Sequence, residues 1–104
     1  LLGRDPVQLD MDRIAAYLKG KNVLVTGAGG SIGSELCRHI ARFSPKTLVL
    51  LDNTENNLFD IEQELKEHFP DIKQFPELAD VRKSCHIKRV FELYHPQVVF
   101  HAAA

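Results

Sequence analysis

Residues 22–33 read NVLVTGAGGSIG, a short apolar run that passes directly into a loop rich in glycine. The apolar run is rich in β-branched side chains, which is typical of a buried strand. Beyond the loop, Ile32, Leu36 and Ile40 recur at every fourth position, and this spacing predicts an amphipathic helix. The loop therefore connects a buried strand to a helix.

The same alternation of strand and helix continues to the end of the chain. Extended apolar runs predict strands at residues 22–26, 47–51, 73–78 and 97–101. Helices are predicted between them, at residues 31–43, 54–69 and 84–94, and Asn53 or Thr54 can cap the second of these. The second helix presents an inward apolar stripe of Leu58, Ile61, Leu65 and Phe69. The third presents one of Ile87, Val90, Phe91 and Tyr94. Pro76 predicts an edge position for its strand, because proline donates no sheet hydrogen bond.

The strands are continuously apolar rather than alternating, which indicates burial on both faces. Such strands form parallel sheets with helices above and below. The predicted fold is a doubly wound α/β domain, and residues 11–104 form the N-terminal part of its Rossmann-type parallel sheet. The strand at residues 97–101 is expected to be buried, and we expect residues beyond Ala104 to complete the domain.

The first ten residues are predicted to be a linker, because Gly3 and Pro6 interrupt any apolar period. A short helix then follows, with Asp10 as its N-cap, Ile14 and Leu18 on one face, and Gly20 at its end.

Composition excludes several classes of protein. The net charge is −1, so no basic excess favours a nucleic-acid or anionic-membrane surface. The apolar runs are far shorter than a membrane span. Cys37 and Cys85 lie outside any metal-ligand spacing, and we expect both to be small residues in or near the core of a cytoplasmic, reduced protein.

The glycine-rich loop has the pattern expected of a dinucleotide-binding loop. Gly27 is predicted to turn the chain off the strand, Gly30 to admit a phosphate against the backbone, and Gly33 to allow close packing of helix on strand. The helix that begins at Ser31 and Ile32 then directs its free N–H groups at a pyrophosphate. A flexible loop without a ligand is the alternative. A P-loop is excluded, because the lysine and hydroxyl residue that should follow the last glycine are absent.

Asp52 ends the second predicted strand, 19 residues after Gly33, and Asn53 follows it. A carboxylate at this place can accept hydrogen bonds from the adenosine ribose and would repel a 2′-phosphate. Asp52 is therefore predicted to bind the ribose and to favour NAD over NADP, and Asn53 is a further candidate for cofactor binding. Alternatively, Asp52 caps the next helix.

Further candidates follow the third and fourth strands. Asp80 is predicted to accept a hydrogen bond from an adenine amino group, and the Val81 N–H to donate one to a ring nitrogen of adenine. Alternatively, Asp80 caps the following helix. The small side chains of Ala102 and Ala103 would let the backbone approach the cofactor. We interpret His101 as a packed or hydrogen-bonded structural histidine rather than a catalytic base.

Four segments together resemble the extended short-chain dehydrogenase/reductase superfamily: TGAGGSIG at 26–33, LLDN at 50–53, DVR at 80–82 and HAAA at 101–104. LLGRDPVQLD at 1–10 and GKNVLVTGAGGSIGSELCR at 20–38 are similar to the CapD-like polysaccharide-biosynthesis family of nucleotide-sugar 4,6-dehydratases and epimerases. The chain departs from that family at Ala79, where glycine is usual.

The resemblance implies a redox-neutral lyase of the UDP-N-acetylglucosamine 4,6-dehydratase type. In that reaction hydride moves from C4 of a UDP-N-acetylhexosamine to NAD, water leaves across C5–C6, and hydride returns to C6. The resemblance places the general acid and base beyond Ala104, so no catalytic residue is assigned here and these residues alone are expected to be inactive. It also implies a cytoplasmic domain of a protein attached to a membrane upstream of Leu1.

Other functions remain open at this point. A nucleotide-sugar 4-epimerase or a reductase would use the same cofactor-binding half, and a sensor module would bind NAD without chemistry. We further expect a homo-oligomer and no nucleic-acid partner.

Overall fold

The computed structural model describes residues 6–103, in which helices and strands alternate along the chain. The elements are α1 (Pro6–Leu18), β1 (Asn22–Thr26), α2 (Ser31–Ala41), β2 (Thr47–Asp52), α3 (Glu55–His68), β3 (Lys73–Leu78), α4 (Ser84–Tyr94) and β4 (Val98–His101). The strand positions agree with the sequence predictions to within a residue at each end. Helix α2 ends two residues earlier than predicted, at Ala41.

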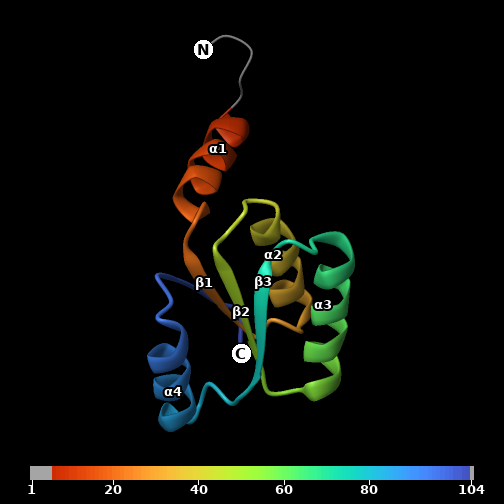
Figure 1. The fold of residues 1–104 in the computed structure, drawn as a ribbon, viewed down its shortest axis with the longest axis vertical. Helices are drawn as coiled ribbons and strands as arrows, with labels where there is room; N and C mark the ends of the chain where they lie inside the picture. The colour runs from red at the N-terminus through yellow and green to blue at the C-terminus, as the bar shows by residue number, and fades with distance from the viewer. Residues whose placement is uncertain (1–5, 104) are drawn as a thin grey trace.

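Across these residues the strands form one parallel sheet in the order β3-β2-β1-β4. Helices α2 and α3 cover one face and α4 covers the other, as Figure 1 shows. The predicted doubly wound α/β fold is therefore confirmed. Because the strands are parallel, their carboxyl ends meet at one edge, and the loops that follow β1, β2 and β3 gather there.

The core has two layers, one on each face of the sheet. Val23 and Val25 pack with α2 and α3, whereas Leu24 between them packs with Val90 of α4. Adjacent side chains of a strand point to opposite faces. A strand covered on both sides therefore needs apolar residues at every position, which explains the continuous run in β1.

The outer strands differ from this pattern. β4 was expected to be buried, but its side chains alternate between half-buried and exposed, and Val99 is 44% exposed. β3 is similar, and its edge position agrees with the prediction from Pro76. Within the residues described, each of these strands has a neighbour on one side only, so its outer edge is uncovered.

Several predicted core residues lie at the surface. Ile14, Ile32 and Phe91 are exposed, while Leu18, Ile40 and Val90 on the same three helices are buried. Helices α2 and α4 pack on the sheet along a stripe narrower than their apolar spacing suggested, and α1 contributes Leu18 to the core. Of the two cysteines, Cys37 is buried, and burial raises the pKa of its thiol to about 12, whereas Cys85 is exposed, contrary to expectation.

The amino-terminal helix begins earlier than predicted. α1 starts at Pro6 and includes Asp10, which is therefore not its N-cap, so the linker prediction is wrong for residues 6–10. Proline is compatible with the first helical turn, because the N–H groups of that turn have no acceptor within the helix and the absence of one costs no hydrogen bond. The rest of the predicted linker, residues 1–5, lies outside the described residues. Among residues 6–103, no helix is both long and apolar enough to cross a membrane.

Candidate cofactor-binding site

A cleft of about 460 Å³ lies at the carboxyl edge of the sheet. All the residues predicted to hold a cofactor line it, together with five residues that were not predicted. The lining residues are Gly27, Gly30, Ser31, Ile32, Gly33, Leu51, Asp52, Asn53, Thr54, Asn57, Ala79, Asp80, Val81, Arg82, Ala102 and Ala103. Four segments that are distant in sequence thus meet around one cavity.

Gly27 and Gly33 are both required by the backbone around them. Gly27 has a φ of +68°, and a Cβ there would lie 2.7 Å from the Ala103 backbone nitrogen. A Cβ on Gly33 would lie 1.8 Å from the Gly27 carbonyl oxygen. The close packing predicted at Gly33 is therefore confirmed, and it brings the start of α2 against the end of β1.

Gly30 is different, because the fold itself does not require glycine there. It is the N-cap of α2, with extended backbone angles that any residue adopts. A Cβ would meet the Gly27 carbonyl oxygen at 3.4 Å, and no other atom of the described chain, neighbouring residues aside, lies within 4 Å. The first N–H groups of α2 have no acceptors within the helix and carry its positive dipole end. This is the geometry of an anion-binding loop.

Asp52 is only 6% exposed, and both oxygens of its carboxylate accept hydrogen bonds. Oδ2 accepts from the Gly29 N–H at 2.8 Å, and Oδ1 accepts from the Thr54 N–H at 2.8 Å. Thr54 is the N-cap of α3, so Asp52 does support the start of that helix. Each oxygen retains a further lone pair, so the same group can still accept from a ligand.

Asp80 is held by its neighbour two residues on. Its Oδ1 accepts from the Arg82 backbone N–H at 2.9 Å and from Nε at 3.0 Å, and its Oδ2 accepts from Nη2 at 2.8 Å. These hydrogen bonds lower the pKa of Asp80 to about 2, so the group is an anion at neutral pH. The N-cap of α4 is Lys83. The carboxylate therefore binds Arg82 rather than capping α4 as the alternative proposed.

His101 is hydrogen-bonded within the sheet. Its Nδ1 lies 2.7 Å from Oγ1 of Thr26, the residue paired with it on β1. This agrees with the prediction of a hydrogen-bonded structural histidine. His101 is not among the residues that line the cleft.

Asn57 and Arg82 line the cleft but were not predicted as site residues. Asn57 lies one helical turn beyond Thr54, and a Cβ on Gly29 would lie 2.6 Å from both its Cβ and its carbonyl carbon. Arg82 follows Asp80 by two residues. Helical spacing from Thr54 was the available signal for Asn57, whereas the Arg82 contact depends on how the loop turns.

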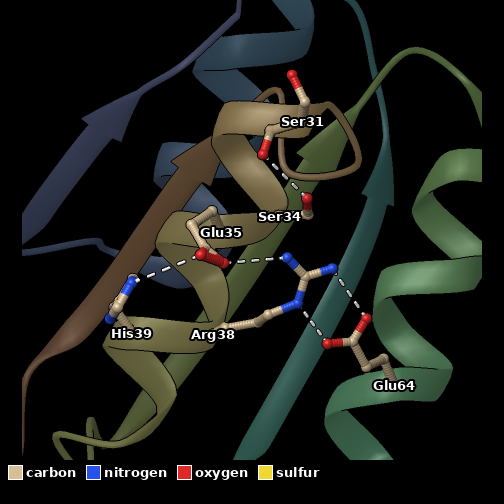
Figure 2. Close-up of polar contacts among 6 residues, drawn as sticks. All are labelled: Ser31, Ser34, Glu35, Arg38, His39 and Glu64. Atoms are coloured by element: carbon tan, nitrogen blue, oxygen red, sulfur yellow. Dashed lines mark hydrogen bonds and ion pairs between the residues drawn. The ribbon is translucent and has the colours of Figure 1, made fainter.

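An ion-pair network joins the two helices beside the cleft, as Figure 2 shows. Arg38 of α2 binds both carboxylate oxygens of Glu64 on α3, through Nε to Oε2 and through Nη2 to Oε1 at 3.0 Å. Its Nη1 also donates to Glu35 at 3.2 Å, and Glu35 lies 3.7 Å from Nε2 of His39. The hydrogen bond from Arg38 lowers the pKa of Glu64. The network holds α3, which carries Asn57, against α2, which follows the glycine loop.

The family described as polysaccharide biosynthesis protein matches residues 23–104. The chain is 48% identical to the capsular polysaccharide biosynthesis protein CapD of Staphylococcus aureus and 50% identical to the probable polysaccharide biosynthesis protein EpsC of Bacillus subtilis. Each alignment covers 100% of this chain and 18% of the relative. The chain thus spans about a fifth of the length of these two relatives.

More distant relatives include named enzymes. The chain is 36% identical to a dTDP-glucose 4,6-dehydratase of Salmonella typhimurium, over 79% of this chain and 22% of that protein. Among solved structures, the epimerase Mth375 of Methanothermobacter thermautotrophicus superposes with a TM-score of 0.67 at 31% identity. That superposition covers 96% of this chain and 27% of the epimerase.

Proposed function

The chain belongs to the polysaccharide biosynthesis protein family, and from this membership we propose that it is the cofactor-binding part of a nucleotide-sugar dehydratase or epimerase. The observation that carries the proposal is the convergence of four segments on one cleft at the carboxyl edge of a parallel sheet. Dinucleotides bind at this place in doubly wound folds.

Each part of the cleft suits one part of NAD. The open side of Gly30 and the N–H groups of Ser31 and Ile32 would bind the pyrophosphate. Asp52 and Asn53 would accept from the ribose hydroxyls. Asp80 and Val81 would pair with the adenine base. The small side chains of Ala102 and Ala103 would leave room for the backbone to approach the cofactor, and all of these residues line the cleft.

We propose a UDP-N-acetylhexosamine, in particular UDP-N-acetylglucosamine, as the substrate of the full-length protein. Bound NAD would supply a hydride acceptor for C4 of the sugar and then a hydride donor for C6. The dTDP-glucose 4,6-dehydratases and the epimerase among the similar proteins support a nucleotide-sugar reaction of this class. The residues described here would bind and orient the cofactor, and the general acid and base would come from other parts of the protein.

A 4-epimerase is the second candidate, and the similarity to the solved epimerase favours it. The two reactions begin with the same oxidation at C4, and they differ in whether water is lost from the sugar. The cofactor-binding residues are the same for both. The product therefore decides between them.

The test is incubation of the full-length protein with UDP-N-acetylglucosamine and NAD. A 4-keto-6-deoxy sugar nucleotide would support the dehydratase, and a C4 epimer would support the epimerase. Calorimetric titration with NAD alone tests the cofactor site separately. NAD binding without either product would support a sensor instead, and failure to bind NAD or NADP would contradict the proposed cofactor site.

A further inference from the structure

Arg82 occupies most of the hydrogen-bonding capacity of Asp80. An ionised carboxylate offers about four lone-pair positions, two on each oxygen. The Arg82 backbone N–H and Nε both bind Oδ1, and Nη2 binds Oδ2. Three of the positions are therefore taken, and the one left lies on Oδ2, in a residue that lines the cleft.

The backbone around Asp80 is also fixed. Its N–H donates to Nδ1 of His86 at 3.1 Å, and the Ala79 N–H donates to the Asp52 carbonyl oxygen at 2.9 Å. The side chain of Asp80 is 17% exposed, whereas that of Arg82 is 77% exposed. Arg82 therefore orients the carboxylate from the solvent side, while the carboxylate is the more enclosed partner.

We propose that Arg82 is a positioning residue that makes this cleft selective for nucleotides of 6-aminopurines over 6-oxopurines. It does so by holding Asp80 as a pure acceptor with one lone pair available on Oδ2. The inference rests on the proposed function, because it assigns the adenine end of the cleft to Asp80.

The chemistry of the two bases separates them at this contact. Adenine presents an amino group, which donates to a carboxylate. Hypoxanthine presents a carbonyl oxygen at the same position, and an anion that only accepts would repel it. A carboxylate free to rotate would discriminate less, because it can turn its charge away from the carbonyl oxygen and toward solvent.

The experiment compares NAD with nicotinamide hypoxanthine dinucleotide, which lacks the amino group, by calorimetry on the full-length protein. We expect the wild type to bind NAD about tenfold or more tightly, the range for one hydrogen bond to a charged group. In Arg82→Ala the backbone bond to Oδ1 remains, so the loop should fold, but the preference should fall to about threefold or less. Arg82→Lys should also lower the preference for NAD, because an ammonium group does not form the bidentate hydrogen bonds to both carboxylate oxygens that a guanidinium forms.

Arg89 provides a matched control. Its Nη2 pairs with Glu77 at 2.8 Å, the same separation as the pair between Arg82 and Asp80, and neither residue of the control pair lines the cleft. Arg89→Ala should keep the full preference for NAD. Circular dichroism spectra establish that each variant is folded.

The outcomes separate the inference from the proposed function. An undiminished preference for NAD in Arg82→Ala or Arg82→Lys would overturn the positioning role. A loss of binding confined to the hypoxanthine dinucleotide would also overturn it, because it would mean that Arg82 itself donates to the base. Equal binding of both dinucleotides by the wild type would overturn the selectivity while leaving the cofactor site in place. Binding of neither dinucleotide would overturn the proposed function and the inference with it.

Discussion

Asp52 at the end of β2 is hydrogen-bonded to Gly29 in the loop after β1, with 2.8 Å between the carboxylate oxygen Oδ2 and the amide nitrogen. The other oxygen binds the Thr54 N–H at the start of α3. One nearly buried carboxylate thus connects the glycine loop, the second strand and the following helix. The residue proposed to recognise the ribose is therefore also part of what shapes the cleft.

Replacement of Asp52 by asparagine should lower the stability of the domain. The amide keeps one accepting oxygen and presents an NH₂ group to either Gly29 or Thr54, so one backbone N–H loses its acceptor. A buried donor left without a partner costs about 1–3 kcal/mol. We expect a fall of that size in the free energy of unfolding, measured by urea denaturation. Asp60→Asn, at an exposed position of α3, is the control and should change little.

Valine at Gly30 should abolish cofactor binding and leave the domain folded. The extended backbone at this residue accommodates a β-branched side chain, which would extend toward the space assigned to the pyrophosphate. The cost in stability should stay within about 1 kcal/mol, since valine is a poorer N-cap than glycine. Calorimetric titration with NAD measures the loss of binding, and retained affinity would remove Gly30 from the site.

Alanine at Gly33 provides the contrasting case. Its Cβ would lie 1.8 Å from the Gly27 carbonyl oxygen, a backbone atom that moves only with the strand. We expect destabilisation of at least about 3 kcal/mol, at the upper end for an overpacked site. Thermal denaturation followed by circular dichroism tests this, and a melting temperature equal to that of the wild type would refute the close packing.

The Arg38–Glu64 pair should stabilise the domain modestly and in a pH-dependent way. Both side chains are about one-third exposed, so a coupling energy of about 1 kcal/mol or less is expected even though the guanidinium binds the carboxylate in a bidentate way. Arg38 lowers the pKa of Glu64 below its ordinary value of 4.5, so the folded protein holds that proton less tightly than the unfolded chain. The stabilisation is therefore complete above about pH 4.5 and is lost as the pH falls through the lower, folded-state pKa.

A double-mutant cycle of Arg38→Ala and Glu64→Gln measures this coupling between pH 7 and pH 2. The pair of Lys66 and Glu62, which is 3.7 Å apart on the surface of α3, serves as the weak reference. High salt should reduce both couplings. A coupling between Arg38 and Glu64 that grows as the pH falls would contradict the assignment.

The parallel sheet and the cleft were predictable because short-range patterns specify them. A continuous apolar run indicates a strand buried on both faces, and β1 and β2 are buried in this way. Parallel strands place their carboxyl ends together, so residues after four strands are brought to one edge without knowledge of any distance. The residues predicted from the loops accordingly line the same cleft.

The errors arose where periodicity does not say what covers a face. Ile32 fits the apolar stripe of α2 but lies in its first turn at the rim of the cleft, where it is 69% exposed. Phe91 is adjacent to the buried Val90, yet α4 packs on the sheet mainly through Val90, with Ile87 and Tyr94 partly buried beside it. The contacts of Asp52 with Gly29 and of Asp80 with Arg82 depend on loop conformation, which no spacing rule supplies.

Asp52 should also determine the choice between NAD and NADP. If Asp52 accepts from the ribose, a 2′-phosphate would bring like charge against a nearly buried carboxylate, which costs on the order of several kcal/mol. That is a preference for NAD over NADP well above tenfold. Arg82, a cation that lines the cleft, already binds Asp80 through Nε and Nη2.

The double substitution Asp52→Ala with Asn53→Arg should shift the preference toward NADP. Because Asp52 also binds Gly29 and Thr54, its removal should weaken binding of both nucleotides, so the ratio of the two dissociation constants is the quantity to compare. Asn53→Arg alone is the control, since it adds the cation while the carboxylate remains. Its ratio of the two dissociation constants should lie between those of the wild type and the double variant. Separate titrations of each nucleotide on the full-length protein give the ratios. Equal affinity of the wild type for NAD and NADP would remove Asp52 from ribose recognition and leave it with the structural role that its two hydrogen bonds already define.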